Sequence, residues 1–159
     1  MANNNKFPWQ QDIIIKHSQR LLKSFENCTG NILLSVTGNP AEIAEALFAA
    51  PFVLVSHGME ADPILNYGNR TALELWELDW ENFTKTPSRY TAEPIAREER
   101  EQMLNEAKTK GFISNYRGIR ISSTGKRFFI EDGIIWNVFD EQQQKCGQAA
   151  TFSHWTPIN

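Results

Sequence analysis

The sequence lacks the features that mark several large classes of protein. No apolar run in its 159 residues approaches the roughly 18 residues of a membrane span. The polar opening stretch, MANNNKFPWQQD, has no apolar core of the kind that a signal peptide needs. We therefore expect no association with a membrane and a cytoplasmic location.

An excess of positive charge is also missing. Lys and Arg total 16 against 19 Asp and Glu, which gives a formal net charge of −3 at pH 7. Proteins that bind nucleic acids through the phosphate backbone need a basic surface. The sequence predicts that nucleic acid is not a partner.

Cysteine and histidine are scarce, with two and three residues. Cys28 and Cys146 stand in unrelated contexts, without a CxxC spacing or a neighbouring histidine. In a reducing compartment they stay free thiols and form no metal site. HExxH, the calcium-loop pattern and glycine-rich phosphate loops are absent as well. The sequence therefore predicts no metal site.

The composition that remains is typical of an ordinary globular domain, with 41% hydrophobic and 22% charged residues. A chain of this length buries roughly 68–70% of the surface it exposes when unfolded. No repeat, low-complexity tract or linker divides it. We expect an N-terminal amphipathic helix with its connection, residues 1–38, followed by one domain, residues 39–159.

The last third of the chain, residues 111–155, is rich in β-branched and aromatic residues. Turn residues at 122–126, 131–133 and 140–145 cut it into three strands, which predicts an antiparallel meander. Residues 127–139 are apolar on both alternating sets, so this strand is expected to be covered on both faces. Strict alternation places Phe128, Ile130, Trp136 and Val138 on one side of it.

The residues upstream alternate between helices and strands. An apolar stripe at helical spacing predicts a helix over residues 7–27. His17 lies on this stripe, and we expect its side chain to be hydrogen-bonded where the helix packs. Asn39 and Pro40 begin the second helix. Strands at 52–57 and 64–67, a helix at 70–77 and a charged helix at 95–110 follow. Residues 78–94 show no sustained period, so we expect short helical turns there or a contribution to a site.

The resulting order, two helices and then β-β-α-α-β-β-β, is the order of a PAS domain. The stretches SHGMEADPILNYGNRTALELW, PSRYTAEPIAREER, YRGIRISSTGKRFFIEDGIIWNVFDE and GQAATFSHW resemble the MEKHLA family, a PAS-related domain. The resemblance covers roughly residues 46–155. It implies an α+β fold with a five-stranded antiparallel sheet and helices on one face, plus the two N-terminal helices. It also implies a sensory or dimer-regulating module, with no ligand that carries over residue by residue.

The residues argue against two PAS cofactors. Flavin photosensors of this fold carry an asparagine-cysteine-arginine motif after the second strand, where this chain reads Asn66-Tyr67-Gly68-Asn69-Arg70-Thr71. Haem would need an axial ligand in the middle helices, and no histidine lies between Gly58 and Ser153. The cofactor therefore remains unknown.

Arginines provide the first group of candidate ligand residues. Arg89, Arg97 and Arg100 lie near Glu93 in the middle of the chain, and guanidinium groups converging on a pocket would bind a carboxylate or phosphate. The simpler interpretation is that Arg89 and Glu93 form ion pairs that hold the irregular segment. Arg120 is the sharpest exception, because it stands between two isoleucines in a half-buried strand.

Two further groups are candidates. Asn137 and Gln148 are amides in apolar strands, where each must be hydrogen-bonded in the core or offered to a ligand, and Trp136 and Phe152 could stack on an aromatic ligand or simply form core. His57 begins a turn that also contains Glu60 and Asp62; the turn itself is the simpler interpretation of that set.

We therefore expect a PAS-like module that binds a small molecule or a partner protein and has no catalytic activity. Its output would pass through association as a homodimer or with another protein. The predicted interface is the apolar stripe Trp9, Ile13, Leu21 and Phe25, which could equally pack on the open face of its own sheet.

Two alternatives stay open. One is a small enzyme that acts on a carboxylated or phosphorylated metabolite, with Arg120, Arg89 and His57 converging. The other is a pure interaction domain with a packed interior.

Overall fold

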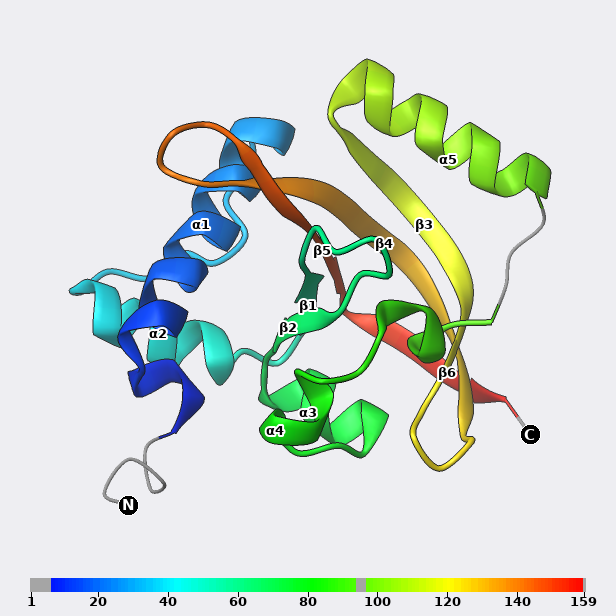
Figure 1. Ribbon diagram of the computed structural model, residues 1–159, viewed down its shortest axis with the longest axis horizontal. Coiled ribbons are helices and arrows are strands. Elements are labelled where there is room, and N and C mark those ends of the chain that lie inside the picture. Colours follow the sequence, from blue (N-terminus) through cyan, green and yellow to red (C-terminus); the bar gives the residue numbers. More distant parts are fainter. Residues whose placement is uncertain (1–6, 94–96, 159) are drawn as a thin grey trace.

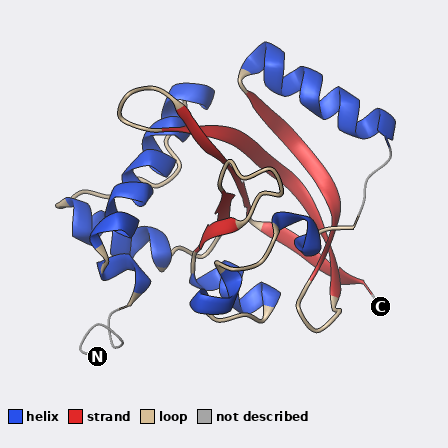
Figure 2. Ribbon diagram, in the orientation of Figure 1, coloured by secondary structure: helices blue, strands red, loops and turns tan. Residues whose placement is uncertain are grey.

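The computed structural model describes residues 7–93 and 97–158 of the chain. Its antiparallel sheet has the strand order β2-β1-β5-β4-β3, with β6 also paired to β4 (Figures 1 and 2). The strands are β1 (Val53–His57), β2 (Leu65–Gly68), β3 (Phe112–Ile121), β4 (Arg127–Phe139), β5 (Lys145–Phe152) and β6 (His154–Ile158). The predicted α+β class and the antiparallel meander of the last third are confirmed.

The sheet has six strands where five were predicted, because the last strand continues past a break. β5 pairs with β4 from Val138↔Gly147 to Ile134↔Thr151, and β6 then continues the same register along β4 as far as Arg127↔Ile158. The bend at Ser153 separates the two segments, opposite the irregular part of β4. β6 is therefore an extension of β5 along β4.

Helices cover both faces of this sheet (Figure 1). The short 3-10 helix η2 (Pro8–Gln10), α1 (Asp12–Thr29) and α2 (Pro40–Phe48) belong to one face, called the outer face below. The other face, called the inner face, is covered by α3 (Arg70–Trp76), α4 (Trp80–Phe83), the 3-10 helix η3 (Ser88–Thr91) and α5 (Arg97–Lys110). Among the described residues, no helix combines the length and apolarity needed to cross a membrane.

Two asparagines fix the starts of α2 and α3. The Asn39 side chain accepts a hydrogen bond from the Glu42 amide, and the Glu42 carboxylate accepts one from the Asn39 amide, each at 2.9 Å. Asn69 is fully buried and caps α3. It also accepts from the Leu54 amide at 3.2 Å and donates to the Phe52 carbonyl at 2.8 Å. Asn69 therefore ties the start of α3 to the central strand β1.

The inner core is built of aromatic rings. Trp76 of α3 lies edge-on to Phe83, Phe128 and Phe152, with ring centroids 6.3, 5.3 and 6.2 Å away. All four side chains are buried. Such pairs contribute roughly 0.5–1.5 kcal/mol each beyond the burial of apolar area. The rings fill the space between α3, α4 and the middle of the sheet.

The outer core is where α1 packs. Leu21 and Phe25 are buried there, and the Phe25 ring lies 4.8 Å from that of Trp136 in an edge-on arrangement. The Ser24 hydroxyl accepts a hydrogen bond from the Phe139 amide at 2.9 Å. Of the two predicted roles for this helix, packing on its own sheet is the one that the structure has. Leu21 and Phe25 are core residues, so their assignment to a partner interface is wrong.

The long strand β4 contributes to both cores because its side chains change faces midway. Phe128, Ile130 and Ile135 lie in the inner core, whereas Trp136 lies in the outer core. Asp132 has a left-handed φ of 57°, and the pairing with β3 shifts in register nearby. An irregularity of this kind re-aims the side chains that follow it. The prediction that Phe128, Ile130 and Trp136 share one side is wrong for this reason.

A chain of hydrogen bonds attaches α1 to the sheet. His17 Nε2 lies 2.9 Å from the Ser56 hydroxyl, which in turn donates to Asn66 Oδ1 at 2.5 Å. Because the Ser56 proton goes to Asn66, His17 must donate from Nε2. This confirms the predicted role of His17 in helix packing. Burial, with a smaller effect from Arg20, lowers the pKa of His17 to about 4.

The segment without periodicity, residues 78–94, contains α4 and η3, as the prediction allowed. η3 is held against the sheet by bridges between Ile64 and Pro87 and between Ala92 and Arg120. The first residues of the predicted helix 95–110 lie outside the described residues, and α5 is seen from Arg97. The predicted division of the chain at residue 38 stays a prediction.

Strands β1 and β5 lie so close together at Gly147 that we expect one added methyl group there to lower the stability of the fold strongly. A Cβ added to Gly147 of β5 would lie 2.2 Å from the His57 carbonyl oxygen of β1, where only backbone movement could relieve the clash. We expect Gly147→Ala to lower the free energy of unfolding by about 3 kcal/mol. Gly58→Ala is the matched control, because its Cβ would meet only the carboxylate of Glu60, an exposed and flexible side chain. Equal urea midpoints for the two variants would contradict this account.

The buried histidine predicts a loss of stability in mild acid. The unfolded chain, with a His17 pKa near 6.5, takes up a proton before the folded chain, whose pKa is about 4. The free energy of unfolding therefore falls as the pH drops through this window, by about 2 kcal/mol between about pH 7.5 and 5. His17→Gln removes the titrating group and should flatten that dependence in urea unfolding. An unchanged slope in the variant would assign the pH effect to other groups.

Candidate functional site

A small cavity of about 80 Å³ lies on the inner face of the sheet, between β1, β3, β5 and η3. Three of the predicted site residues meet in its wall: His57 of β1, Arg120 of β3 and Gln148 of β5. The rest of the lining is Val55, Ser56, Leu65, Ser88, Thr91, Ile135, Ala149 and Ala150. We call this space the inner cavity.

Strand register brings the three polar residues together. His57 and Gln148 are paired across β1 and β5, and the bridge between Ala92 and Arg120 holds the segment after η3 against β3. Gly147 next to Gln148 lets β5 approach the His57 carbonyl closely. The small residues of β5 therefore let the strands pack closely and also leave room in front of Arg120.

Arg120 has the most unusual environment of the three. Its Nη1 donates to the Thr91 hydroxyl at 3.4 Å, and its guanidinium carbon lies 5.3 Å from the centre of the Tyr116 ring. Its Nε is buried and makes no hydrogen bond to any described residue. None of the ion pairs among the described residues includes Arg120. Burying an N–H donor of a charged group without an acceptor costs free energy. Nε of Arg120 is therefore an unsatisfied donor at the inner cavity.

His57 is fixed by its own turn. Its Nδ1 lies 2.9 Å from the Gly58 carbonyl oxygen, which can only accept. Nδ1 therefore carries the proton, and Nε2 is left without a partner among the described residues. Of the two carboxylates in the same turn, Glu60 accepts a hydrogen bond from the Ile64 amide and Asp62 pairs with Arg89.

Gln148 lines both the inner cavity and a second, separate hollow of about 460 Å³ under α5. Its Nε2 lies 3.5 Å from Asn137 Oδ1, the outer limit of a hydrogen bond. Lys108 of α5 and Lys145 of β5 line the same hollow. The two candidate amides therefore face α5, and each keeps hydrogen-bonding capacity.

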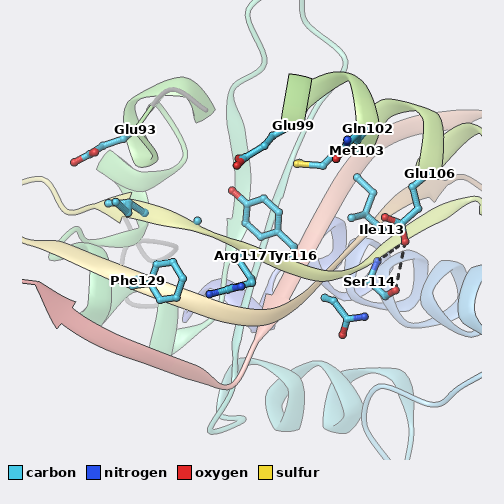
Figure 3. Close-up of a pocket in the computed structure, with 13 residues that line it drawn as sticks. Glu93, Glu99, Gln102, Met103, Glu106, Ile113, Ser114, Tyr116, Arg117 and Phe129 are labelled. Carbon is cyan, nitrogen blue, oxygen red and sulfur yellow. Dashed lines mark hydrogen bonds between the residues drawn. The ribbon is translucent and has the colours of Figure 1, made fainter. Parts of the chain in front are cut away.

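A third hollow, of about 710 Å³, runs between α5 and β3 (Figure 3). Tyr116 points from β3 toward Glu99 of α5, and Arg117 lies on the other side of the strand, with its guanidinium 5.4 Å from the centre of the Phe129 ring. Glu106 of α5 accepts hydrogen bonds from the amide and hydroxyl of Ser114. This groove was not predicted from the sequence, where the charged character of the helix was the one related feature.

The other candidates are not brought to the inner cavity. Trp136 lies on the outer face against Phe25, and Phe152 lies in the aromatic filling of the inner core. Arg89 is exposed and paired with Asp62 at 3.1 Å. The side chains of Arg97 and Arg100 lie outside the described part of the structure.

The simpler interpretation of the arginine cluster holds where it can be seen. Glu93 forms a two-bonded ion pair with Arg127 of β4, which fastens the end of the irregular segment to the sheet. Arg89 fastens the same segment to the β1–β2 connection through Asp62. Ser88 and Thr91 also line the inner cavity and were not among the predicted site residues. Their position in an aperiodic segment was the available signal.

The side chains present do not fit a flavin or a haem in the inner cavity. Its volume of about 80 Å³ is far below the roughly 300–1,000 Å³ of sites for such molecules. Cys28 and Cys146 pack against the outer core, away from the face where a flavin adduct would form. Among residues 7–93 and 97–158, no three His, Cys, Asp or Glu side chains are grouped to hold a metal ion.

Comparison with known proteins agrees with this architecture. The profile of the MEKHLA domain matches residues 15–157. The PAS domain of a protein from Colwellia psychrerythraea superposes with a TM-score of 0.59 at 14% identity, covering 74% of this chain and 94% of that one. A search of curated proteins gave no significant match.

Two light-oxygen-voltage structures are also similar. One comes from a study of the domain mechanism with a flavin analogue, with a TM-score of 0.54, 12% identity and coverage of 74% of this chain and 85% of that one. The other is an RNA-binding receptor, with a TM-score of 0.59, 16% identity and coverage of 76% of this chain but 36% of the receptor. At these identities the likeness concerns the fold alone. The chain belongs to the MEKHLA domain family and has the fold of a PAS domain.

Proposed function

We propose that the chain is a PAS-like sensory or regulatory module that binds a small molecule in the inner cavity and has no catalytic activity of its own. Binding would be signalled through association of the chain with a second copy or with a partner protein. The observation that carries the proposal is the meeting of His57, Arg120 and Gln148, from three strands, in one cavity. A hollow lined by apolar side chains with a few convergent polar groups is the usual form of a small-molecule site, and these three side chains are half-buried in its wall.

The energetics of burial support a ligand. Polar groups in a core are normally paired, and an unpaired one costs roughly 1–3 kcal/mol. Arg120 Nε has no partner among the described residues, and the Asn137–Gln148 contact is at the limit of hydrogen bonding. A molecule that accepts hydrogen bonds at these positions would satisfy them.

The surface at the start of α1 supports association. Ile13 is 72% exposed and Phe7 is 59% exposed, and Phe7 stacks on the partly exposed Trp9 with ring centroids 5.8 Å apart. Exposed apolar side chains that lie together are typical of contact surfaces. Of the predicted partner interface, Trp9 and Ile13 are the two residues that a second copy of the chain could reach.

The enzyme alternative is less well supported. It required Arg89, Arg120 and His57 to converge, and Arg89 lies at the surface in an ion pair with Asp62. The buried pair of Ser56 and His17 does not replace them. Ser56 is 2% exposed and donates its proton to Asn66, so His17 does not act as its base.

Native mass spectrometry tests the ligand. The chain is purified from its own source organism and weighed under native and denaturing conditions. We expect a reproducible excess of mass in the native sample that disappears on denaturation, since the inner cavity offers unpaired donors to a small molecule. A native mass equal to the bare chain, or to an integer multiple of it, would contradict ligand binding and favour a pure interaction domain.

A charge placed on the exposed apolar surface tests association. We expect the chain to form a homodimer in sedimentation experiments and Ile13→Asp to weaken it by about tenfold or more, because a buried carboxylate would lose its hydration. Ile32→Asp is the matched control, since Ile32 is 67% exposed but lies in the connection after α1. An unchanged dimer in Ile13→Asp, or an equal loss in both variants, would remove this surface from the proposal.

A further inference from the structure

We infer that the ligand of the inner cavity is a small monocarboxylate, held by the guanidinium of Arg120. The inference rests on the proposed function and adds the chemical class of the ligand. It comes from three properties of the cavity wall: its charge, the free edge of one guanidinium group, and its size.

The charge of the wall selects an anion. Arg120 is permanently charged and is the one arginine or lysine in the lining. The lining contains no Asp or Glu, and no ion pair neutralises Arg120 among the described residues. Most other described arginines differ, since Arg20, Arg89 and Arg127 each pair with a carboxylate. Arg120 is half-buried, and a bound anion would supply the counter-charge that no described carboxylate supplies.

The free edge of the guanidinium selects a planar anion. Nη1 of Arg120 is used by the Thr91 hydroxyl, and the Tyr116 ring lies against the group. Nε, together with Nη2, forms the side-on edge, which makes no hydrogen bond to any described residue. Two parallel N–H groups on this edge match the two oxygens of a carboxylate. The Gln148 side-chain amide, which can donate, provides a further polar contact within the cavity.

The size of the inner cavity and the apolar part of its wall select a ligand with a short alkyl chain. A volume of about 80 Å³ holds about six non-hydrogen atoms, when each needs the roughly 10–15 Å³ of one water-sized probe. Val55, Leu65, Ile135 and Ala150 form the apolar side of the wall. A carboxylate with an alkyl part of about one to three carbon atoms would place its charged group at Arg120 and its alkyl part against these apolar side chains.

A monoanion fits this wall better than a phosphate dianion. One guanidinium group balances a single negative charge. A second negative charge in an apolar cavity would need a further cation or several more donors. Inorganic phosphate therefore serves as the competing anion in the test, and an amide of the same shape serves as the neutral competitor.

Titration calorimetry on the full chain tests the inference. The probes are acetate, propionate, butyrate and inorganic phosphate, with propionamide as the uncharged analogue of propionate. We expect one carboxylate per chain to bind, propionate at least about tenfold more tightly than propionamide or phosphate, because the amide cannot make the charge-assisted pair. Binding of the amide with equal affinity, or of phosphate in preference to every carboxylate, would overturn the inference.

Arginine variants link the binding to this cavity. Arg120→Gln keeps hydrogen-bonding capacity and loses the charge, and Arg120→Lys keeps the charge and loses the planar edge. We expect each to weaken propionate binding by at least about tenfold. Arg117→Gln is the matched control on the same strand, since Arg117 is exposed and rests on Phe129. Far-ultraviolet circular dichroism confirms that each variant is folded, and unchanged binding in folded Arg120→Lys and Arg120→Gln would refute the role of Arg120.

The two levels of the proposal fail differently. A neutral molecule found by native mass spectrometry, together with no carboxylate binding, would overturn the carboxylate and leave the sensory module standing. A bare native mass together with no binding of any probe would overturn both.

Discussion

The strand β4 is the constraint on which both cores depend. It pairs with β3 along one edge and with β5 and β6 along the other. Helices cover both sides of it, so it must present apolar side chains to two layers. The left-handed backbone at Asp132 achieves the change of face between Ile130 and Trp136. Such a conformation in a residue other than glycine costs of order 1 kcal/mol, which the burial of two aromatic clusters easily offsets.

The inner cavity is a consequence of how that strand and its neighbours are filled. Around Trp76 the space is closed by Phe83, Phe128 and Phe152. Toward the other end of β5 the side chains become small, and Ala150 lies beside space that no ring occupies. Arg120 enters this space from β3 with a buried, unpaired Nε. Packing is therefore tight where the rings meet and loose where the polar groups meet.

The sequence predicted the elements well and their faces less well. The cap at Asn39 is a local signal, since it depends on residues within one turn, and the start of α2 was predicted from it. The change of face in β4 was missed, although Asp132 and Gly133 were recognised as a punctuating pair, because an irregular residue reverses the parity of every later position. Trp136 was a candidate ligand residue and lies on the other face, whereas His57, Arg120 and Gln148 line one cavity. Arg120 and Gln148 were singled out as polar residues in apolar strands, and His57 for its turn.

Two neighbouring residues of β1 relate the inner cavity to the outer helix. His57 lines the inner cavity, while Ser56 bonds His17 of α1 on the outer face. Consecutive residues of a strand point to opposite faces of the sheet. The two faces are therefore linked here through two adjacent residues of β1, without any intervening element. The pairing of β1 and β5 at His57 and Gln148 fixes the same stretch of backbone from the other side. The wall of the inner cavity and the His17 anchor therefore share one stretch of the β1 backbone, within one residue of each other.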